Sequence, residues 1–148
     1  MRDMLHHDSL QHFNQAEEDA LFLQKVRLSE KSKFRTYLAL NPNLMKHPMY
    51  CCLEVQEFKG IAATKLRLSS HNLAVERGRW QRQPREERVC RLCDSGDVQD
   101  EQHIISRCPS TQTVRTDNPH VNFDVPEVFS EDPVTLTSLL YTIVKAFV

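Results

Sequence analysis

The sequence lacks the features that would place the protein in a membrane or a secretory compartment. Its longest apolar-rich stretch, residues 136–148, contains threonine and lysine and is too short to span a bilayer. The chain opens Met-Arg-Asp without the apolar core of a signal peptide, so nothing indicates an oxidising compartment, and we expect an intracellular protein of the nucleus or cytoplasm. Internal repeats and low-complexity tracts are also missing, and 148 residues fit one compact domain. We therefore expect no membrane partner.

The charge of the chain is close to balanced, at a formal net −1, but it is unevenly distributed. Residues 65–91 carry eight Lys or Arg against three Glu, which makes a net charge of +5. Residues 94–132 carry nine acidic groups against two arginines, which makes −7. The overall balance therefore hides a basic segment that runs into an acidic one.

Three cysteines and one histidine stand where the two charged segments meet, in the pattern Cys-x2-Cys-x9-His-x4-Cys. The residues are Cys90, Cys93, His103 and Cys108. Thiolates and imidazole at such spacing are the ligands of a closed structural zinc site, and Gly96 between the pairs can take the positive φ of a turn. The alternatives are a chance grouping of small buried residues or disulfides, but five cysteines would leave one unpaired. We predict one structural Zn²⁺ and, because all four positions are filled, no hydrolytic zinc chemistry.

Apolar residues recur at helical intervals through most of the chain, which predicts a mainly α fold: a small helical domain with an embedded Cys3His zinc knuckle. The expected helices are 17–26, 29–40, 49–68, a short helix within 69–78, and 133–148. In the last one, Asp132-Pro133 marks the start, and Leu136, Leu140 and Ile143 share one face that should pack on the earlier helices.

The same features divide the chain into five segments. These are a flexible N-terminus (1–15), a helical region (16–75), a basic segment with the zinc-binding module (76–110), an acidic loop (111–132) and a C-terminal helix (133–148). The acidic segment is expected to be a loop because it contains Asn118-Pro119 and Val125-Pro126.

Several runs around the zinc motif resemble a known family. They are KLRLSSHNL (65–73), ERGRW (76–80), PREERVC (84–90), DEQH (100–103) and CP (108–109). Together they are similar to the C-terminal region of non-LTR retrotransposon reverse transcriptases, in which a zinc-binding motif follows the polymerase. The resemblance is strongest over residues 65–110 and extends weakly on both sides.

The resemblance implies that the four motif residues bind zinc and that the module assists nucleic-acid handling during target-primed reverse transcription. It does not imply that this chain copies RNA, because a polymerase needs paired aspartates for two catalytic metals and no Asp-Asp pair occurs here. We expect a non-enzymatic, detached C-terminal module without a small-molecule substrate, either an element fragment or a host protein derived from one.

An arginine-rich stretch before the metal motif is the candidate nucleic-acid surface. Its residues are Arg77, Arg79, Trp80, Arg82, Arg85, Arg88 and Arg91. Guanidinium groups can bind phosphates and the Trp ring can stack on a base, of RNA or DNA. The alternative is a charged face whose arginines pair with Glu76, Glu86 and Glu87 and whose Trp80 lies in the core. In that case the domain is structural or binds a protein partner, without nucleic-acid contact.

His71 follows two serines, but a serine near a histidine is no catalytic triad without an oriented acid and an oxyanion hole. We expect His71 to buttress the helix junction beside the zinc site, or to orient a zinc ligand.

Overall fold

The computed structural model describes residues 20–21, 24–25 and 35–147. The chain divides into two units, 1–35 and 36–148, and nearly all described residues belong to the second. The expected flexible N-terminus (1–15) and most of the two helices expected over 17–26 and 29–40 lie outside the described residues. The described end of the second of these helices is α2, Arg35–Leu40.

The second unit is built around helix α6, Pro133–Lys145. Its first turn is capped by Asp132, whose side chain accepts hydrogen bonds from the amides of Val134 and Thr135 at 3.1 and 3.0 Å. Leu136 and Leu140 are fully buried on the face that the apolar spacing of the sequence predicts. Helix α6 begins at Pro133, where the sequence placed the start of the last helix.

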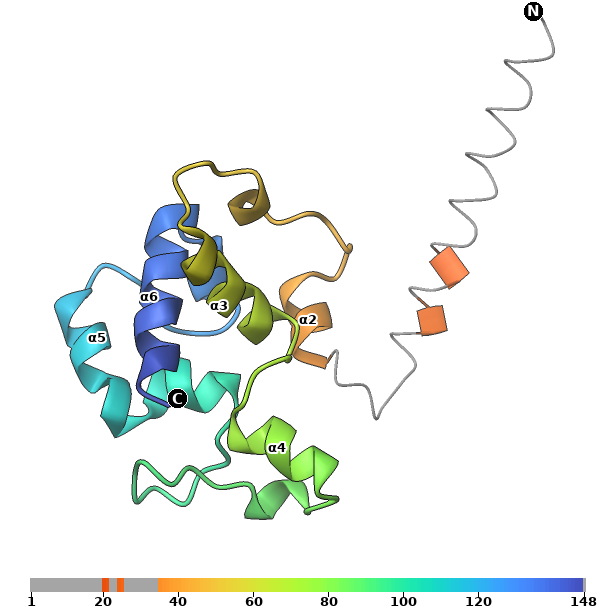
Figure 1. Cartoon of the computed structure of the whole chain (residues 1–148), viewed down its shortest axis with the longest axis vertical. Coiled ribbons are helices and arrows are strands. Elements are labelled where there is room, and N and C mark those ends of the chain that lie inside the picture. The colour runs from red at the N-terminus through yellow and green to blue at the C-terminus, as the bar shows by residue number, and fades with distance from the viewer. Residues whose placement is uncertain (1–19, 22–23, 26–34, 148) are drawn as a thin grey trace, which may run out of the picture. The chain divides into compact units, whose positions relative to one another are not determined.

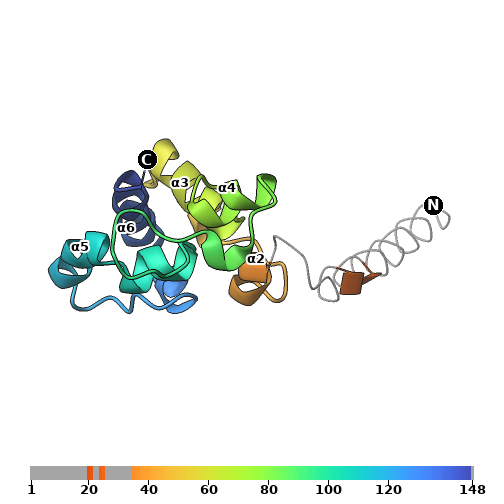
Figure 2. The same ribbon diagram turned by 90° about the horizontal axis from the view of Figure 1, so that it is seen from below.

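Helices pack on both flanks of α6, as Figures 1 and 2 show from two sides. Helix α3, Glu57–Arg67, makes the most extensive packing and contributes Ala63 and Leu66 to the core. Helix α5, Gln112–Asp117, and the short helical turns Pro48–Tyr50, His103–Arg107 and Glu127–Ser130 also contact α6. The expected mainly α fold with a Cys3His cluster is confirmed. Among the described helices, none is both long and apolar enough to cross a membrane.

Two expected elements differ from the structure. The helix expected over 49–68 begins only at Glu57: Met49 is buried in the core as part of the 3₁₀ turn Pro48–Tyr50, but Leu53, between this turn and α3, is 101% exposed and gains nothing from the core. The loop expected over 111–132 contains α5 and the turn Glu127–Ser130. Helix α5 forms because Pro109 opens a preceding 3₁₀ turn, Pro109–Thr111, which leads directly into it.

Helix α4, Ala74–Trp80, contains Gly78 in its interior, whereas the sequence placed a helix end there. A Cβ atom at Gly78 would lie 2.6 Å from Cγ of Arg88. The glycine is therefore required by the close approach of the Arg88 side chain and not by a turn.

Candidate metal centre

A short hairpin carries the first two cysteines of the motif. We call residues 88–99 the metal hairpin. Val89 and Val98 pair in antiparallel orientation, and backbone hydrogen bonds of 2.8 and 2.9 Å flank this pair. The chain reverses through Gly96, whose φ of +74° is in the left-handed region, as the sequence predicts.

The other two candidate ligands flank a five-residue π-helical turn, His103–Arg107. His103 is the first residue of this turn, and Cys108 directly follows it. The amide of Cys108 donates to the carbonyl of His103 at 2.8 Å, which closes the turn. At its start, the amide of His103 donates to Oδ1 of Asp100 at 2.9 Å. Between them, Ile104 and Ile105 are fully buried in the core, so the apolar core fixes the position of this half of the site.

The two halves converge on one point. One ligand atom from each of Cys90, Cys93, His103 and Cys108 lies within 4.8 Å of all the others, and Sγ of Cys93 is 3.4 Å from Nε2 of His103. Ligand atoms at about 2.0–2.3 Å from a tetrahedral ion are themselves roughly 3.5–3.8 Å apart. Three of the residues are buried and Cys93 is partly buried. The cluster could therefore hold one metal ion.

The surroundings of Cys93 and Cys108 shift the pKa values of their thiols in opposite directions. The hydroxyl of Ser95, 3.2 Å from Sγ of Cys93, is the main cause of a lowered pKa of that thiol. Burial raises the pKa of Cys108, and the nearby Cys90 raises it further. Cys90 receives a hydrogen bond from Nε2 of Gln99 at 3.4 Å. The thiolate that binds a metal therefore forms more readily at Cys93 than at Cys108.

The far side of the histidine ring faces a carboxylate. Nδ1 of His103 is buried, lies 3.5 Å from Oδ2 of Asp97 and has no hydrogen-bond partner. Metal-binding histidines commonly present one nitrogen to the ion and the other to a carboxylate, which fixes the ring orientation. Here Nε2 faces the sulfurs, so Asp97 stands where such a carboxylate is needed.

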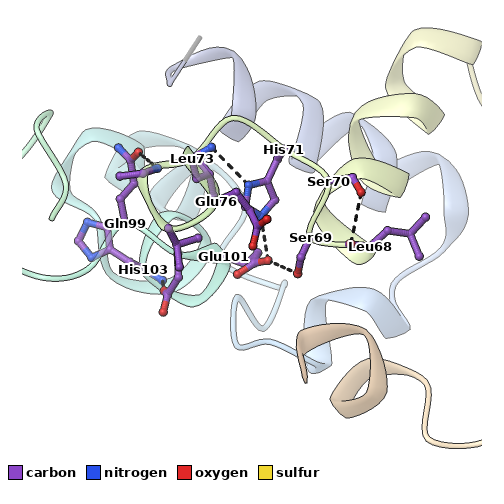
Figure 3. A network of polar contacts seen from close by, with 12 residues as sticks. Leu68, Ser69, Ser70, His71, Leu73, Glu76, Gln99, Glu101 and His103 are labelled. Carbon is purple, nitrogen blue, oxygen red and sulfur yellow. Dashed lines mark hydrogen bonds and ion pairs between the residues drawn. The ribbon is translucent and has the colours of Figure 1, made fainter. Parts of the chain in front are cut away.

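A buried polar network joins the metal region to the linker between α3 and α4 (Figure 3). Oε1 of Glu101 accepts hydrogen bonds from Oγ of Ser69 at 2.7 Å and from Nε2 of His71 at 2.8 Å. Nδ1 of His71 accepts from the amide of Leu73 at 3.3 Å. Burial alone would raise the pKa of Glu101, but the hydrogen bonds and charge of His71, together with Ser69, outweigh burial and lower it.

This network is structural. The hydroxyl of Ser69 donates to Glu101, and both ring nitrogens of His71 are engaged elsewhere, so the serine and histidine do not form a nucleophile–base pair. His71 buttresses the helix junction, as expected from the sequence, and makes no hydrogen bond to a motif residue.

Three of the predicted nucleic-acid residues have side chains that hydrogen bond to other parts of the protein, although none of the three is buried. Arg79 donates twice to Oε2 of Glu76, at 2.8 and 3.1 Å. Arg85 donates to Oδ2 of Asp100 at 2.6 Å. Arg88 donates to the carbonyls of Val75 and Gln83, with the three bonds between 2.6 and 2.9 Å. Arg88 thus ties the metal hairpin to α4, and Arg85 ties the approach to the hairpin to Asp100, whereas the Arg79–Glu76 pair lies within α4.

The other three arginines and the tryptophan are presented to solvent. Arg77, Arg82 and Arg91 are exposed, and their side chains have no hydrogen-bond or ion-pair partner in the part of the chain that the structure describes. Trp80 is 79% exposed, and Cζ of Arg79 lies 5.1 Å from its ring centroid. The structure thus separates the predicted surface into a hydrogen-bonded set (Arg79, Arg85 and Arg88) and an exposed set without side-chain hydrogen bonds (Arg77, Trp80, Arg82 and Arg91).

Three acidic residues that position the site were not among the predicted site residues: Asp97, Asp100 and Glu101. Two of them stood in the DEQH run that carries the family resemblance. In the sequence, all three carboxylates lie between candidate metal ligands, and this position was the one sign of their role. The structure shows their contacts: Asp97 with His103, Asp100 with Arg85, and Glu101 with His71.

Comparison of the chain with protein-family models, with curated proteins and with solved structures gave no match. The resemblance to retrotransposon reverse transcriptases therefore stays a prediction from the residues that carry it.

Proposed function

We propose that this chain is a zinc-binding, non-catalytic module that binds RNA or DNA through the exposed part of its arginine-rich segment, and that it derives from a non-LTR retrotransposon reverse transcriptase. The observation that carries the proposal is the 79% exposure of Trp80 among three exposed arginines without partners. Large aromatic side chains normally bury most of their area, so a tryptophan this exposed needs a reason.

Zinc is the metal that suits the donor set. Three thiolates and one imidazole around one point match the closed tetrahedral sites of structural zinc. Because four protein ligands leave no position for water or substrate, the metal would stabilise the fold and carry out no reaction.

The exposed set offers two kinds of contact that nucleic-acid binding uses: positive charge for phosphates and an aromatic ring for a base. Arg77, Arg82 and Arg91 are free to neutralise phosphates, and one face of the Trp80 ring is supported by Arg79, which Glu76 holds in place. The opposite ring face would then be available to a base. With three free arginines, binding would be modest in affinity and weakened by salt.

The single tryptophan makes the proposal testable without a label. Trp80 is the only tryptophan in the chain, so its fluorescence reports on this surface alone. We expect titration with single-stranded DNA or RNA to quench this fluorescence, and the apparent affinity to fall as salt rises from about 0.05 to 0.2 M. Absence of quenching and of binding at the lower salt concentration would refute nucleic-acid binding.

The second candidate is a protein-interaction domain, which the exposed apolar residues of α3 favour. Phe58 is 51% and Ile61 is 47% exposed, and Ile61 lines hollows of about 420 and 270 Å³. This function becomes the better one if the titration above gives no binding while the chain is folded and metal-loaded.

A further inference from the structure

A cavity of about 160 Å³ lies between α4 and the chain that enters the metal hairpin. One side of the cavity is formed by α4 and the residue that follows it. The lining residues there, Ala74, Arg77, Gly78 and Gln81, are spaced three or four apart, as neighbours on a helix surface are. Since about 10–15 Å³ already accommodates a water molecule, the cavity has room for a phosphate group with part of its hydration shell.

The charges around this cavity favour an anion. Arg77 comes from α4 and Arg91 from the metal hairpin, and neither guanidinium has a partner among the described residues. Arg88 also lines it, with its guanidinium already bonded to the carbonyls of Val75 and Gln83. The acidic lining residue is Glu87, so three arginines face one carboxylate.

We propose that this cavity holds one backbone phosphate of a single-stranded nucleic acid, with a base adjacent to that phosphate stacked on Trp80. The proposal rests on the proposed function and specifies its ligand. Arg77 and Trp80 are three residues apart on α4, so their Cβ atoms are about 5–6 Å apart, and one nucleotide can reach both.

The strand must be single because of the tryptophan. A base inside a duplex is stacked on its neighbours and cannot offer its face to a side chain, whereas unpaired bases stack readily on exposed aromatic rings. The cavity also depends on the metal hairpin, because Arg91 lies between two candidate ligands, Cys90 and Cys93.

The test measures binding of the full, zinc-loaded chain to a fluorescent oligodeoxythymidine of about ten nucleotides, to the matching oligouridine, and to the same length of duplex. We expect the single strands to bind at least roughly tenfold more tightly than the duplex. Arg77→Ala and Arg91→Ala should each weaken single-strand binding by roughly tenfold and lower the salt slope by about 0.7. Trp80→Ala should weaken binding about 5- to 150-fold.

Glu87→Gln is the sharpest variant, because it should improve binding. Removing the carboxylate that opposes the phosphate should tighten single-strand binding about two- to fivefold, a gain that misfolding cannot produce. Arg107→Ala is the charge-matched control: Arg107 is exposed, has no described partner and does not line the cavity, so its loss should have a smaller effect.

The outcomes separate this inference from the proposed function. Single-strand binding that is insensitive to Arg77→Ala, Arg91→Ala and Glu87→Gln overturns the cavity but leaves nucleic-acid binding intact. Equal affinity for duplex and single strand overturns the choice of ligand. If no oligonucleotide binds to the folded, zinc-loaded chain, both proposals are wrong.

Discussion

Arg82 is a residue at which the proposed binding function and the stability of the fold would conflict. It follows the end of α4 with a φ of +56°, in the left-handed region where glycine is favoured at the end of a helix. An L-residue with a long side chain costs about 1–2 kcal/mol there. The side chain has no described partner that would offset this cost, which is consistent with a role in binding.

Arg82→Gly should therefore stabilise the protein and weaken nucleic-acid binding. We expect the free energy of unfolding to rise by about 0.5–1 kcal/mol, because the glycine removes the strain but gains freedom in the unfolded chain. Chemical denaturation of the metal-loaded chain measures this. Arg82→Ala is the matched control: it loses the guanidinium in the same way but keeps a Cβ atom, so it should bind as weakly without the gain in stability. Unchanged affinity in Arg82→Gly would remove Arg82 from the binding surface.

The exposure of single side chains was the least predictable part of the site. Arg77, Arg79 and Arg88 look alike in the sequence, but Arg79 pairs with Glu76 and Arg88 bonds to two carbonyls, whereas Arg77 is exposed. Which arginine finds a partner depends on contacts made after folding. The four candidate metal ligands were predictable because their chemistry restricts both residue type and spacing.

Among the secondary-structure elements, those that bury a regular apolar face could be predicted from the sequence. Helix α6 is such a case, with Leu136, Leu140 and Ile143 fully buried at helical spacing. The predicted start of α3 was wrong because Leu53 continues the helical pattern but is fully exposed, and the buried Met49 before it belongs to a separate 3₁₀ turn. Periodicity reports which residues share a face of a possible helix, and it does not report whether the core covers that face.

The cap of α6 makes a pH-dependent prediction for this element. The hydroxyl of Thr135 and the amides of Thr135 and Val134 hydrogen bond to Asp132 and lower its pKa. A carboxyl group with a lowered pKa in the folded state stabilises the fold above its usual pKa, and this contribution is lost as the pH falls through the folded-state value.

Asp132→Ala should lower the melting temperature near neutral pH, and the difference from the wild-type chain should shrink as the solution becomes more acidic than the usual Asp pKa of about 3.9. Thermal unfolding of both chains at matched pH measures the difference, so acid effects common to both cancel. Asp132→Asn keeps an acceptor for the helix amides and should lose less stability near neutral pH. A difference between wild type and Asp132→Ala that does not depend on pH would contradict a role for the carboxylate charge.

Across the whole molecule, the metal site connects the core to the proposed binding surface. Its π-helical half carries Ile104 and Ile105 into the core around α6, and its hairpin half carries Arg91 to the cavity beside α4. Two hydrogen bonds strengthen this connection: Arg85 donates to Asp100, and Arg88 donates to a carbonyl of α4. An ion shared by both halves would therefore fix the position of Arg91 relative to the core.

Removal of the metal should accordingly affect stability and binding together. Cys93→Ser should abolish the one zinc per chain that we expect in native mass spectrometry. It should also lower the melting temperature by more than about 10 °C and weaken single-strand binding, because structural zinc contributes several kcal/mol to small domains. Cys51→Ser is the control, since Cys51 is an exposed free thiol outside the motif and its replacement should leave metal content, stability and affinity unchanged. A Cys93→Ser chain that unfolds at the wild-type temperature and binds oligonucleotide equally well would show that neither the fold nor the surface depends on the ion.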